Sequence, residues 1–454
     1  NPIINFRSYS DSPELVRDFG NSFINGLQST GIYACAKHFP GHGNTNIDSH
    51  SSLPIINGTK NELESVELKP FKSAVKNGVK MIMVGHIAMP GLDSSNVPAS
   101  FSKSITSNLL RKDWGFDGLI ITDGMEMGGL TESTSAAEAA ILAVEAGADI
   151  LLLPMDVDNT INSLVLAVEN GRLSEERINQ SVERIWKAKT ELNLFKESKP
   201  SWANVEKNIG ISQNTKVANK IAEKSITIVK DINKEFPLRP QEIQKLNHLI
   251  LSTDEGAPDM LKSFLSNIKN THSNVEEIYV TQPISNIRAG EIIKKSKLAD
   301  KTLVTLLVRI RMDKGISTID STHADLIKKL NQENINFVVV SFGSPYLPSY
   351  DYIDSYLCAY GYGKVSQVAA ANVLWGRKKS VGKLPVDLSP ILNRGSGVIS
   401  LKSKHFNGYE QKYDLSSAWA IIDSAINNKI FPGSQVFIAK NEKIIASRGF
   451  GYHT

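Results

Sequence analysis

Residues 118–123 read Gly-Leu-Ile-Ile-Thr-Asp, a short apolar run that ends on a carboxylate. Continuous apolar runs of this length are typical of strands that are buried on both faces of a parallel sheet. Three other runs before residue 200 have the same character, at 31–39, 79–86 and 148–153. We therefore predict four buried strands in the first 195 residues.

Helical patterns separate and follow these runs. They lie at 62–77, 104–112, 135–146, 160–170 and 175–194. Alternating strands and helices predict a parallel α/β sheet, either an open doubly wound sheet or part of a (β/α)8 barrel. Polar residues follow the carboxyl ends of the strands, where barrel enzymes keep their catalytic groups. Four strands are half of a barrel, so we expect the first half of such a barrel to be absent from this chain.

A second α/β pattern runs from about 215 to 395, after a linker-like stretch at 199–202. Its strand candidates are 225–229, 248–252, 277–281, 302–308, 337–342 and 356–360. The ionisable residues of this region do not gather at one group of strand ends, which favours a supporting domain. The tail contains an amphipathic helix at 416–427 and a hairpin-like pattern at 434–447 that turns at 440–442.

Composition excludes several classes of protein. The chain has 454 residues, 51 of them basic and 47 acidic, and its net charge of +4 gives no nucleic-acid footprint. No run approaches the roughly 18 apolar residues of a membrane-spanning helix, so we expect no membrane span. The two cysteines, Cys35 and Cys358, lie in apolar strand-like runs and are expected to be buried thiols rather than a disulfide.

Three of the nine histidines fall in residues 37–50, which read KHFPGHGNTNIDSH. Asp48 is two residues from His50, and a carboxylate can orient an imidazole and support its charged form for proton transfer. A zinc site is the alternative, because His38 and His42 are four residues apart. The proline and glycines between them prevent the helix that would place both rings on one face. We therefore expect no metal.

Two further residues have both a functional and a structural interpretation. Asp123 ends an apolar strand, so its carboxylate is expected to point into a site, but a strand-end aspartate can also be the N-cap of the next helix. His86 follows the run 79–86 and is either a site residue or a core histidine with satisfied hydrogen bonds. The sequence leaves both alternatives open.

Three motifs together resemble one family. Residues 1–8 (NPIINFRS), 37–50 and 121–127 (ITDGMEM) are similar, in order and spacing, to family 3 glycoside hydrolases of the bacterial β-N-acetylglucosaminidase type. The resemblance implies that 1–198 is the C-terminal half of a (β/α)8 TIM barrel. Residues 199–397 resemble the family's α/β sandwich domain. Residues 398–454 resemble a linker and the start of a serine β-lactamase-like α+β domain, fused to such hydrolases in some bacteria, which implies an exported or periplasmic setting.

The resemblance also implies roles for individual residues and a reaction. The catalytic residues would be the nucleophile Asp123 and the acid/base His50, which Asp48 orients. The substrate-binding residues would be Lys37, His38, Arg7 and, at the rim, His86. The implied reaction is retaining hydrolysis of terminal β-linked N-acetylglucosamine, without a cofactor, from cell-wall oligosaccharides or muropeptide-type substrates of the kind that arise in peptidoglycan recycling.

Two alternative functions remain at this point. A family 3 β-glucosidase would normally take its acid/base from a glutamate of the second domain, and the Asp-Ser-His sequence at 48–50 argues against that. A non-catalytic module that binds wall sugars for a downstream domain would be free to lose its catalytic residues. Asp123, Asp48 and His50 are all present.

Overall fold

The computed structural model describes residues 4–45, 47, 49, 52–131, 134–196, 201–310, 318–399, 416–440 and 443–451. The described chain forms two compact units, one up to Ile209 and one from Gly210 onward. The division falls a few residues after the linker expected at 199–202.

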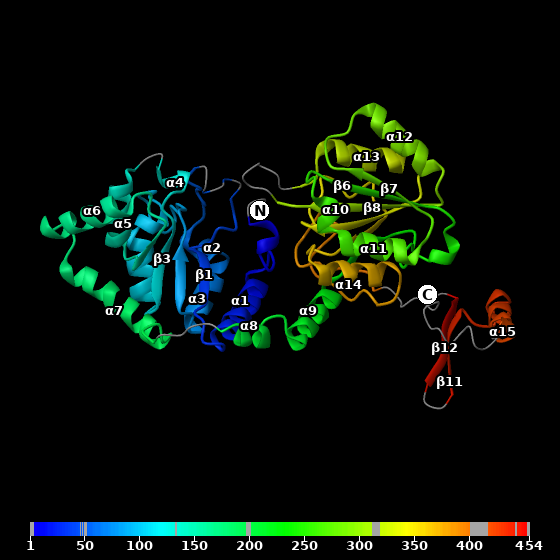
Figure 1. Cartoon of the computed structure of the whole chain (residues 1–454), viewed down its shortest axis with the longest axis horizontal. Helices are drawn as coiled ribbons and strands as arrows, with labels where there is room; N and C mark the ends of the chain where they lie inside the picture. Colours follow the sequence, from blue (N-terminus) through cyan, green and yellow to red (C-terminus); the bar gives the residue numbers. More distant parts are fainter. Residues whose placement is uncertain are drawn as a thin grey trace. The chain divides into compact units, whose positions relative to one another are not determined.

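The first unit contains a four-stranded parallel sheet with the strand order β1-β2-β3-β4 (Figure 1). The strands are β1 (Cys35–Phe39), β2 (Met81–Val84), β3 (Leu119–Gly124) and β4 (Ile150–Leu152). Each of the four predicted runs contains one strand, so the prediction of a parallel α/β sheet is confirmed. The described residues of this unit hold four strands and not the eight of a closed barrel. The assignment to half of a barrel therefore stays a prediction.

Helices precede and follow these strands. They are α1 (Pro13–Gln28), α2 (Lys60–Ser65), α3 (Leu68–Lys76), the π-helix η3 (Ser104–Asp113), α4 (Gly128–Thr131), α5 (Ala136–Ala146), α6 (Val157–Glu169), α7 (Glu175–Glu191) and α8 (Trp202–Asn208), with short 3-10 turns η1 (Asn5–Arg7) and η2 (Ala99–Phe101). Side-chain caps start several of them; Ser135, Asp156 and Ser174 each accept a hydrogen bond from a backbone amide of the first turn. The helix predicted at 62–77 is two helices, because α2 ends at Ser65.

A buried carboxylate fastens α7 to the sheet. Asp149 stands just before β4, and its side chain is fully buried. It accepts hydrogen bonds from Arg111 of η3, from Ser181 Oγ (2.7 Å) and Arg184 Nη1 (3.2 Å) of α7, and from the amide of Ile120 (2.9 Å). One carboxylate thus links η3, α7 and the starts of two strands.

The rest of α7 continues past the amino ends of the other strands. Lys187 pairs with Asp117, which precedes β3, at 3.2 Å. Glu191 accepts hydrogen bonds from Lys80 before β2, at 3.0 Å, and from Tyr33 before β1. A pocket of about 270 Å³ lies among these residues. The charged groups named here are paired with one another, so this end of the sheet is held by ion pairs.

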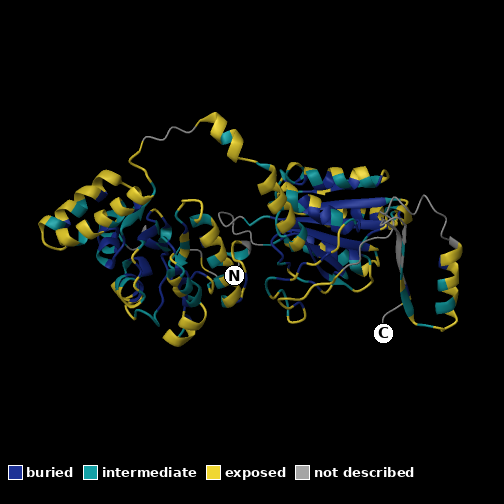
Figure 2. Ribbon diagram, turned by 90° about the horizontal axis from the view of Figure 1, so that it is seen from below, coloured by how far each residue is buried: buried dark blue, intermediate teal, exposed yellow. Residues whose placement is uncertain are grey.

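The second unit is built on a six-stranded sheet with the order β5-β10-β9-β8-β6-β7, in which only β5 is antiparallel to its neighbour. The strands are β5 (Thr227–Asp231), β6 (Leu246–Ser252), β7 (Val275–Val280), β8 (Lys301–Val308), β9 (Phe337–Gly343) and β10 (Ser355–Cys358). Every residue of β6, β8 and β9 is buried, and Figure 2 shows these strands in dark blue between more exposed helices. All six predicted strands are present.

Helices cover both faces of this second sheet (Figure 1). One core cluster joins it to α9 (Ser212–Ser225), α11 (Lys262–Thr271) and α14 (Lys364–Leu374), and another joins it to α12 (Asn286–Lys297) and α13 (Ser321–Gln332). The short elements η4 (Pro240–Glu242) and α10 (Ala257–Met260) complete the unit. Cys358 is buried here as expected, whereas Cys35 is exposed, because β1 is an edge strand of the first sheet.

The tail has a helix and a hairpin. The helix α15 (Ser416–Asn427) has the predicted bounds, and β11 (Gly433–Lys440) pairs antiparallel with β12 (Lys443–Gly451). Residues 441 and 442 of the expected turn lie outside the described residues. The Trp419 and Phe450 rings pack with centroids 5.4 Å apart. The likeness to a β-lactamase stays a prediction. None of the helices that the structure describes combines the length and apolar character needed to cross a membrane.

We expect Asp149→Ala to lower the free energy of unfolding of the first unit by about 3–5 kcal/mol, because it removes a fully buried carboxylate from two partly buried guanidinium groups. The control is Asp117→Ala, since Asp117 and Lys187 form an exposed pair and such pairs contribute little. Urea unfolding gives the free energy of unfolding of both variants. Hydrogen exchange of the β3 and β4 amides then shows whether the loss of stability lies in the first unit. Equal losses in the two variants would contradict the role given to Asp149.

Candidate active site

Asp123 lies at the carboxyl end of β3. Its side chain is 17% exposed, and its Oδ1 accepts a hydrogen bond from the amide of Gly124 at 3.0 Å. Its Oδ2 is 3.5 Å from Nε2 of His38. The next helix, α4, starts at Gly128, so Asp123 is too early in the chain to be its N-cap. The carboxylate is therefore presented at the strand end and is not used to cap a helix.

His38 reaches the same place from β1. Its side chain is 12% exposed, and its ring stands edge-on to that of His42, with centroids 6.0 Å apart. His42 in turn has Nε2 at 3.2 Å from Oγ of Ser49. The carbonyl of Ser49 accepts a hydrogen bond from the amide of Gly129 at 3.2 Å. The loop after β1 is thus fastened to the segment that follows Asp123.

Asp48 and His50 lie outside the described residues. Ser49 between them is described and buried, and its carbonyl bonds to the segment after β3. The roles expected for Asp48 and His50 as an acid/base pair therefore remain predictions.

The His38 imidazole is held in its neutral form. Burial lowers its pKa to about 4, although the nearby Asp123 carboxylate acts in the opposite direction. The positive charges of Lys37 and Arg7, together with His42, lower the pKa further. A neutral ring beside Asp123 neither protonates this carboxylate nor neutralises it at physiological pH.

Lys37 and Arg7 are both exposed, Lys37 on β1 and Arg7 at the end of η1. Both are close enough to His38 for their charges to act on its pKa. The structure therefore places Asp123 next to His38, and the charges of Lys37 and Arg7 act on the His38 ring.

His86 is placed differently from the rim position that the resemblance implied. Its ring is fully buried just after β2, with Nδ1 at 2.9 Å from Oγ of Ser100 and Nε2 at 3.0 Å from the carbonyl oxygen of Gly124. A ring without exposed surface cannot touch a sugar in this structure. This position agrees with the core-histidine alternative.

Two residues near the site were not found from the sequence. The amide of Gly85 donates to the carbonyl of Phe39 at 2.8 Å, and a Cβ at position 85 would lie 3.1 Å from Cβ of His38. Ser100 supports the His86 ring. A glycine that directly follows an apolar strand was the one available signal, because it often marks a close approach of two chain segments.

Among the residues that the structure describes, no three histidine, cysteine, aspartate or glutamate side chains lie together in a way that could hold a metal ion. The one donor pair considered from the sequence is His38 and His42, and His42 contacts Ser49 through Nε2. The arrangement pairs the carboxyl group of Asp123 with the His38 imidazole, and a carboxyl group presented in this way can act as a nucleophile in covalent catalysis.

The sequence of the first unit matches a known family. Residues 1–188 match the family model described as "Glycosyl hydrolase family 3 N terminal domain". Residues 1–188 belong to glycosyl hydrolase family 3. The resemblance drawn from the three sequence motifs is therefore confirmed for this part of the chain.

Two proteins named beta-hexosaminidase are similar to parts of this chain. Beta-hexosaminidase A of Pseudoalteromonas piscicida is 32% identical over 284 residues, which cover 58% of this chain and 46% of that protein. A beta-hexosaminidase of Neisseria meningitidis serogroup C (strain 053442) is 37% identical over 152 residues, which cover 34% of this chain and 42% of that protein. The chain thus spans less than half the length of these two curated relatives.

A solved structure extends the likeness into the second unit. The glycoside hydrolase family 3 beta-N-acetylglucosaminidase from Paenibacillus sp. str. FPU-7 matches with a TM-score of 0.73 and 28% identity. The match covers 86% of this chain and 74% of that chain. The likeness thus extends well beyond the 188 residues of the family 3 domain.

We expect His38 of the family 3 unit to titrate near pH 4 in an NMR pH titration. Lys37→Gln should raise this pKa because a cation is removed, and Asp123→Asn should lower it because the anion is lost. The unfolded chain then binds more protons than the folded one between about pH 6.5 and 4, so folding stability falls as the pH drops through this window.

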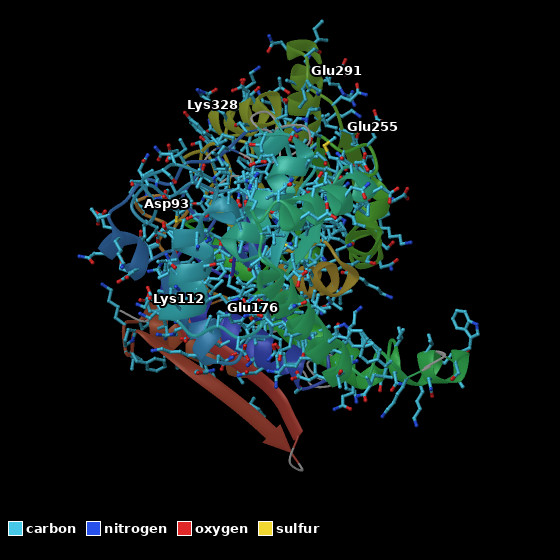
Figure 3. All side chains as sticks on the ribbon, turned by 90° about the vertical axis from the view of Figure 1, so that its left-hand side faces the viewer. Asp93, Lys112, Glu176, Glu255, Glu291 and Lys328 are labelled. Carbon is cyan, nitrogen blue, oxygen red and sulfur yellow. The ribbon has the colours of Figure 1, made fainter. Side chains whose placement is uncertain are left out.

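The matched control is Lys112→Gln. Lys112, labelled in Figure 3, is an exposed lysine at the end of η3, which leads into the amino end of β3, whereas Asp123 lies at the carboxyl end of that strand. It should leave the pKa of His38 unchanged. A wild-type pKa near 6.5 for His38 would contradict the burial of this ring.

Proposed function

We propose that the chain is part of a retaining glycoside hydrolase that removes terminal β-linked N-acetylglucosamine, with Asp123 as the nucleophile. The observation that carries the proposal is the position of Asp123, which is half-buried at a strand end and held by the Gly124 amide beside a neutral His38. The names of the relatives support the choice of sugar.

The proposed reaction has two steps. Asp123 attacks the anomeric carbon and forms a glycosyl ester, while protonated His50 gives its proton to the departing oxygen. Neutral His50 then takes a proton from water, which attacks the same carbon and releases Asp123 and the sugar. Asp48 orients the His50 ring and supports its charged form. The residues expected to do this need no metal or organic cofactor.

The nucleophile needs to be anionic, exposed on one side and fixed in direction. The Gly124 amide donates to Oδ1, which restricts the orientation of the carboxyl group. The partial exposure of Asp123 leaves room for a substrate atom to approach. Because His38 is neutral, it does not form a full ion pair that would reduce the nucleophilicity of Asp123.

Substrate binding is assigned to Lys37, His38 and Arg7. Their side chains can donate hydrogen bonds to sugar hydroxyl oxygens, and Lys37 and Arg7 are exposed where a ligand can reach them. In this proposal residues 1–198 are the C-terminal half of the catalytic barrel. Residues 199–397 are the supporting α/β sandwich domain, and residues 398–454 lead into a β-lactamase-like domain. The substrate would be a cell-wall oligosaccharide or muropeptide.

A direct assay separates this function from its alternatives. The full-length protein is tested against an aryl β-N-acetylglucosaminide and the matching aryl β-glucoside. Preference for the acetamido sugar supports the proposal, and preference for glucoside would make the protein a β-glucosidase. Binding of wall sugars without turnover of either would indicate a non-catalytic module.

We expect Asp123→Asn to abolish formation of the covalent intermediate while the protein stays folded, because an amide has the shape of a carboxylate but is a poor nucleophile. A 2-fluoro or 5-fluoro glycoside traps the intermediate, and mass spectrometry of the digested protein locates the label. In the wild type the labelled peptide should contain Asp123.

Glu126→Gln is the matched control. Glu126 is an exposed carboxylate three residues further along the chain. This variant should be labelled like the wild type. A label on Glu126, or the absence of any label in the wild type, would overturn the assignment of Asp123.

We expect the effect of His50→Ala to depend on the leaving group. A poor leaving group needs the proton of His50, whereas dinitrophenolate departs without help, so kcat/KM should fall strongly for natural aglycones and modestly for activated aryl glycosides. Asp48→Ala should show the same trend less steeply, because the ring remains but loses its orienting partner.

The measurement is a series of aryl glycosides of graded leaving-group pKa, assayed with the wild type and His50→Ala. A much steeper line for the variant means that His50 transfers a proton. Parallel lines would show that the loop at 48–50 only closes over the sugar and binds it, and this part of the mechanism would then be wrong.

A further inference from the structure

The ring of His86, which follows β2, contacts β3 at Gly124, the residue after Asp123. Its Nε2 is 3.0 Å from the carbonyl oxygen of Gly124 in β3. A carbonyl oxygen only accepts hydrogen bonds, so Nε2 carries the hydrogen and donates it. In the neutral ring Nδ1 then accepts from the Ser100 hydroxyl at 2.9 Å. Both nitrogens are engaged, and the ring orientation is fixed.

Gly124 makes hydrogen bonds with both His86 and Asp123. The amide of Gly124 donates to Oδ1 of Asp123 at 3.0 Å, and the carbonyl of the same glycine accepts from His86 and from the amide of Met127. Glycine has the least restricted backbone of all residues, so these hydrogen bonds, together with the pairing of Gly124 with Leu152 of β4, hold position 124 in place. The direction of the Asp123 carboxylate therefore depends on His86.

The residue before His86 makes the corresponding contact on the other side. The amide of Gly85 donates to the carbonyl of Phe39, the neighbour of His38 on β1. A side chain at position 85 would press on Cβ of His38. Two consecutive residues at the end of β2 thus fix both members of the His38–Asp123 pair.

The partner of His86 is itself firmly placed. Ser100 lies in the 3-10 turn η2 and is 1% exposed. The amide of the preceding Ala99 donates to the carbonyl of Ile87 at 2.8 Å. Asp93, labelled in Figure 3, accepts a hydrogen bond from Ser102, and Ser102 accepts one from the amide of Ile105 in η3. The loop that carries Ser100 therefore cannot shift easily to follow a displaced ring.

We propose that His86 is a positioning residue, whose Nε2–H bond to the Gly124 carbonyl sets the location of the Asp123 carboxylate relative to His38. This inference rests on the proposed function only for its kinetic consequence, because the geometric consequence can be measured without a substrate. The role differs from sugar binding, since the ring is fully buried.

Two amide variants test the proposal. Glutamine can place a donor near the position of the histidine Nε2, whereas asparagine reaches only as far as Nδ1 and loses the bond to Gly124. We expect His86→Asn to lower kcat about 10- to 100-fold with little change in KM, because a nucleophile displaced by about 1 Å reacts far more slowly. His86→Gln should restore most of kcat, and Ser100→Ala should cause a smaller loss than His86→Asn.

His248 provides the matched control. It is a fully buried histidine of β6 in the second unit, with Nε2 at 2.8 Å from Oγ1 of Thr305. His248→Asn should lower the melting temperature but leave kcat per folded molecule unchanged. The measurement therefore distinguishes loss of stability from loss of positioning.

Crystal structures of the wild type, His86→Asn and His86→Gln supply the second readout. The distance between His38 Nε2 and Asp123 Oδ2, 3.5 Å here, should increase in His86→Asn and be kept in His86→Gln. If the wild type turns over no aryl glycoside, the proposed function is wrong. The distance between His38 Nε2 and Asp123 Oδ2 then tests the positioning role of His86 without any kinetic measurement. An unchanged distance in His86→Asn, or a wild-type kcat in that variant, would overturn the proposal.

Discussion

The arrangement of the first unit depends on the buried carboxylate of Asp149. A buried charge is tolerated only when its oxygens are fully engaged, and Asp149 meets this requirement with two arginines, a serine and a backbone amide. The partners come from three places in the chain, η3, α7 and β3, so one set of bonds fixes η3, α7 and the start of β3 together. Fixing the start of β3 also fixes the position of its last two residues, the first of which is Asp123.

The two ends of the same sheet are held by different kinds of interaction. At the amino ends, α7 uses ion pairs such as Lys187 with Asp117 and Glu191 with Lys80. At the carboxyl ends, the strands are joined by hydrogen bonds of the Gly85 amide and the His86 ring to backbone carbonyls. Structural ion pairs beside Asp123 would compete for its charge. The contacts that join these strand ends are hydrogen bonds to backbone carbonyls, which leave the Asp123 carboxyl group free of a structural ion pair with them.

The sequence predicted the strands well because their burial is visible in composition. The runs that became β3, β6, β8 and β9 are continuous and apolar, as strands buried on both faces have to be. The helix α1 was missed because only Ile24 in it is buried and two glycines interrupt its pattern. Asp123 and His38 were found from strand ends and motifs. The burial of His86 was not predicted. A histidine that follows an apolar run can lie at the rim of a site or in the core, and the sequence does not distinguish the two.

The neighbour relations of the strands have a consequence for the order of folding. In the first unit the strand order in space is the order in sequence, so each strand can pair as soon as it and its predecessor have been synthesised. In the second unit β5 pairs with β10, and the bond from Ser355 to Asp231 joins residues 124 positions apart. During translation, β5 is therefore synthesised well before its partner β10 and stays unpaired in the meantime. Its apolar residues need protection during that interval, which makes the second sheet the slower and more aggregation-exposed part of the chain.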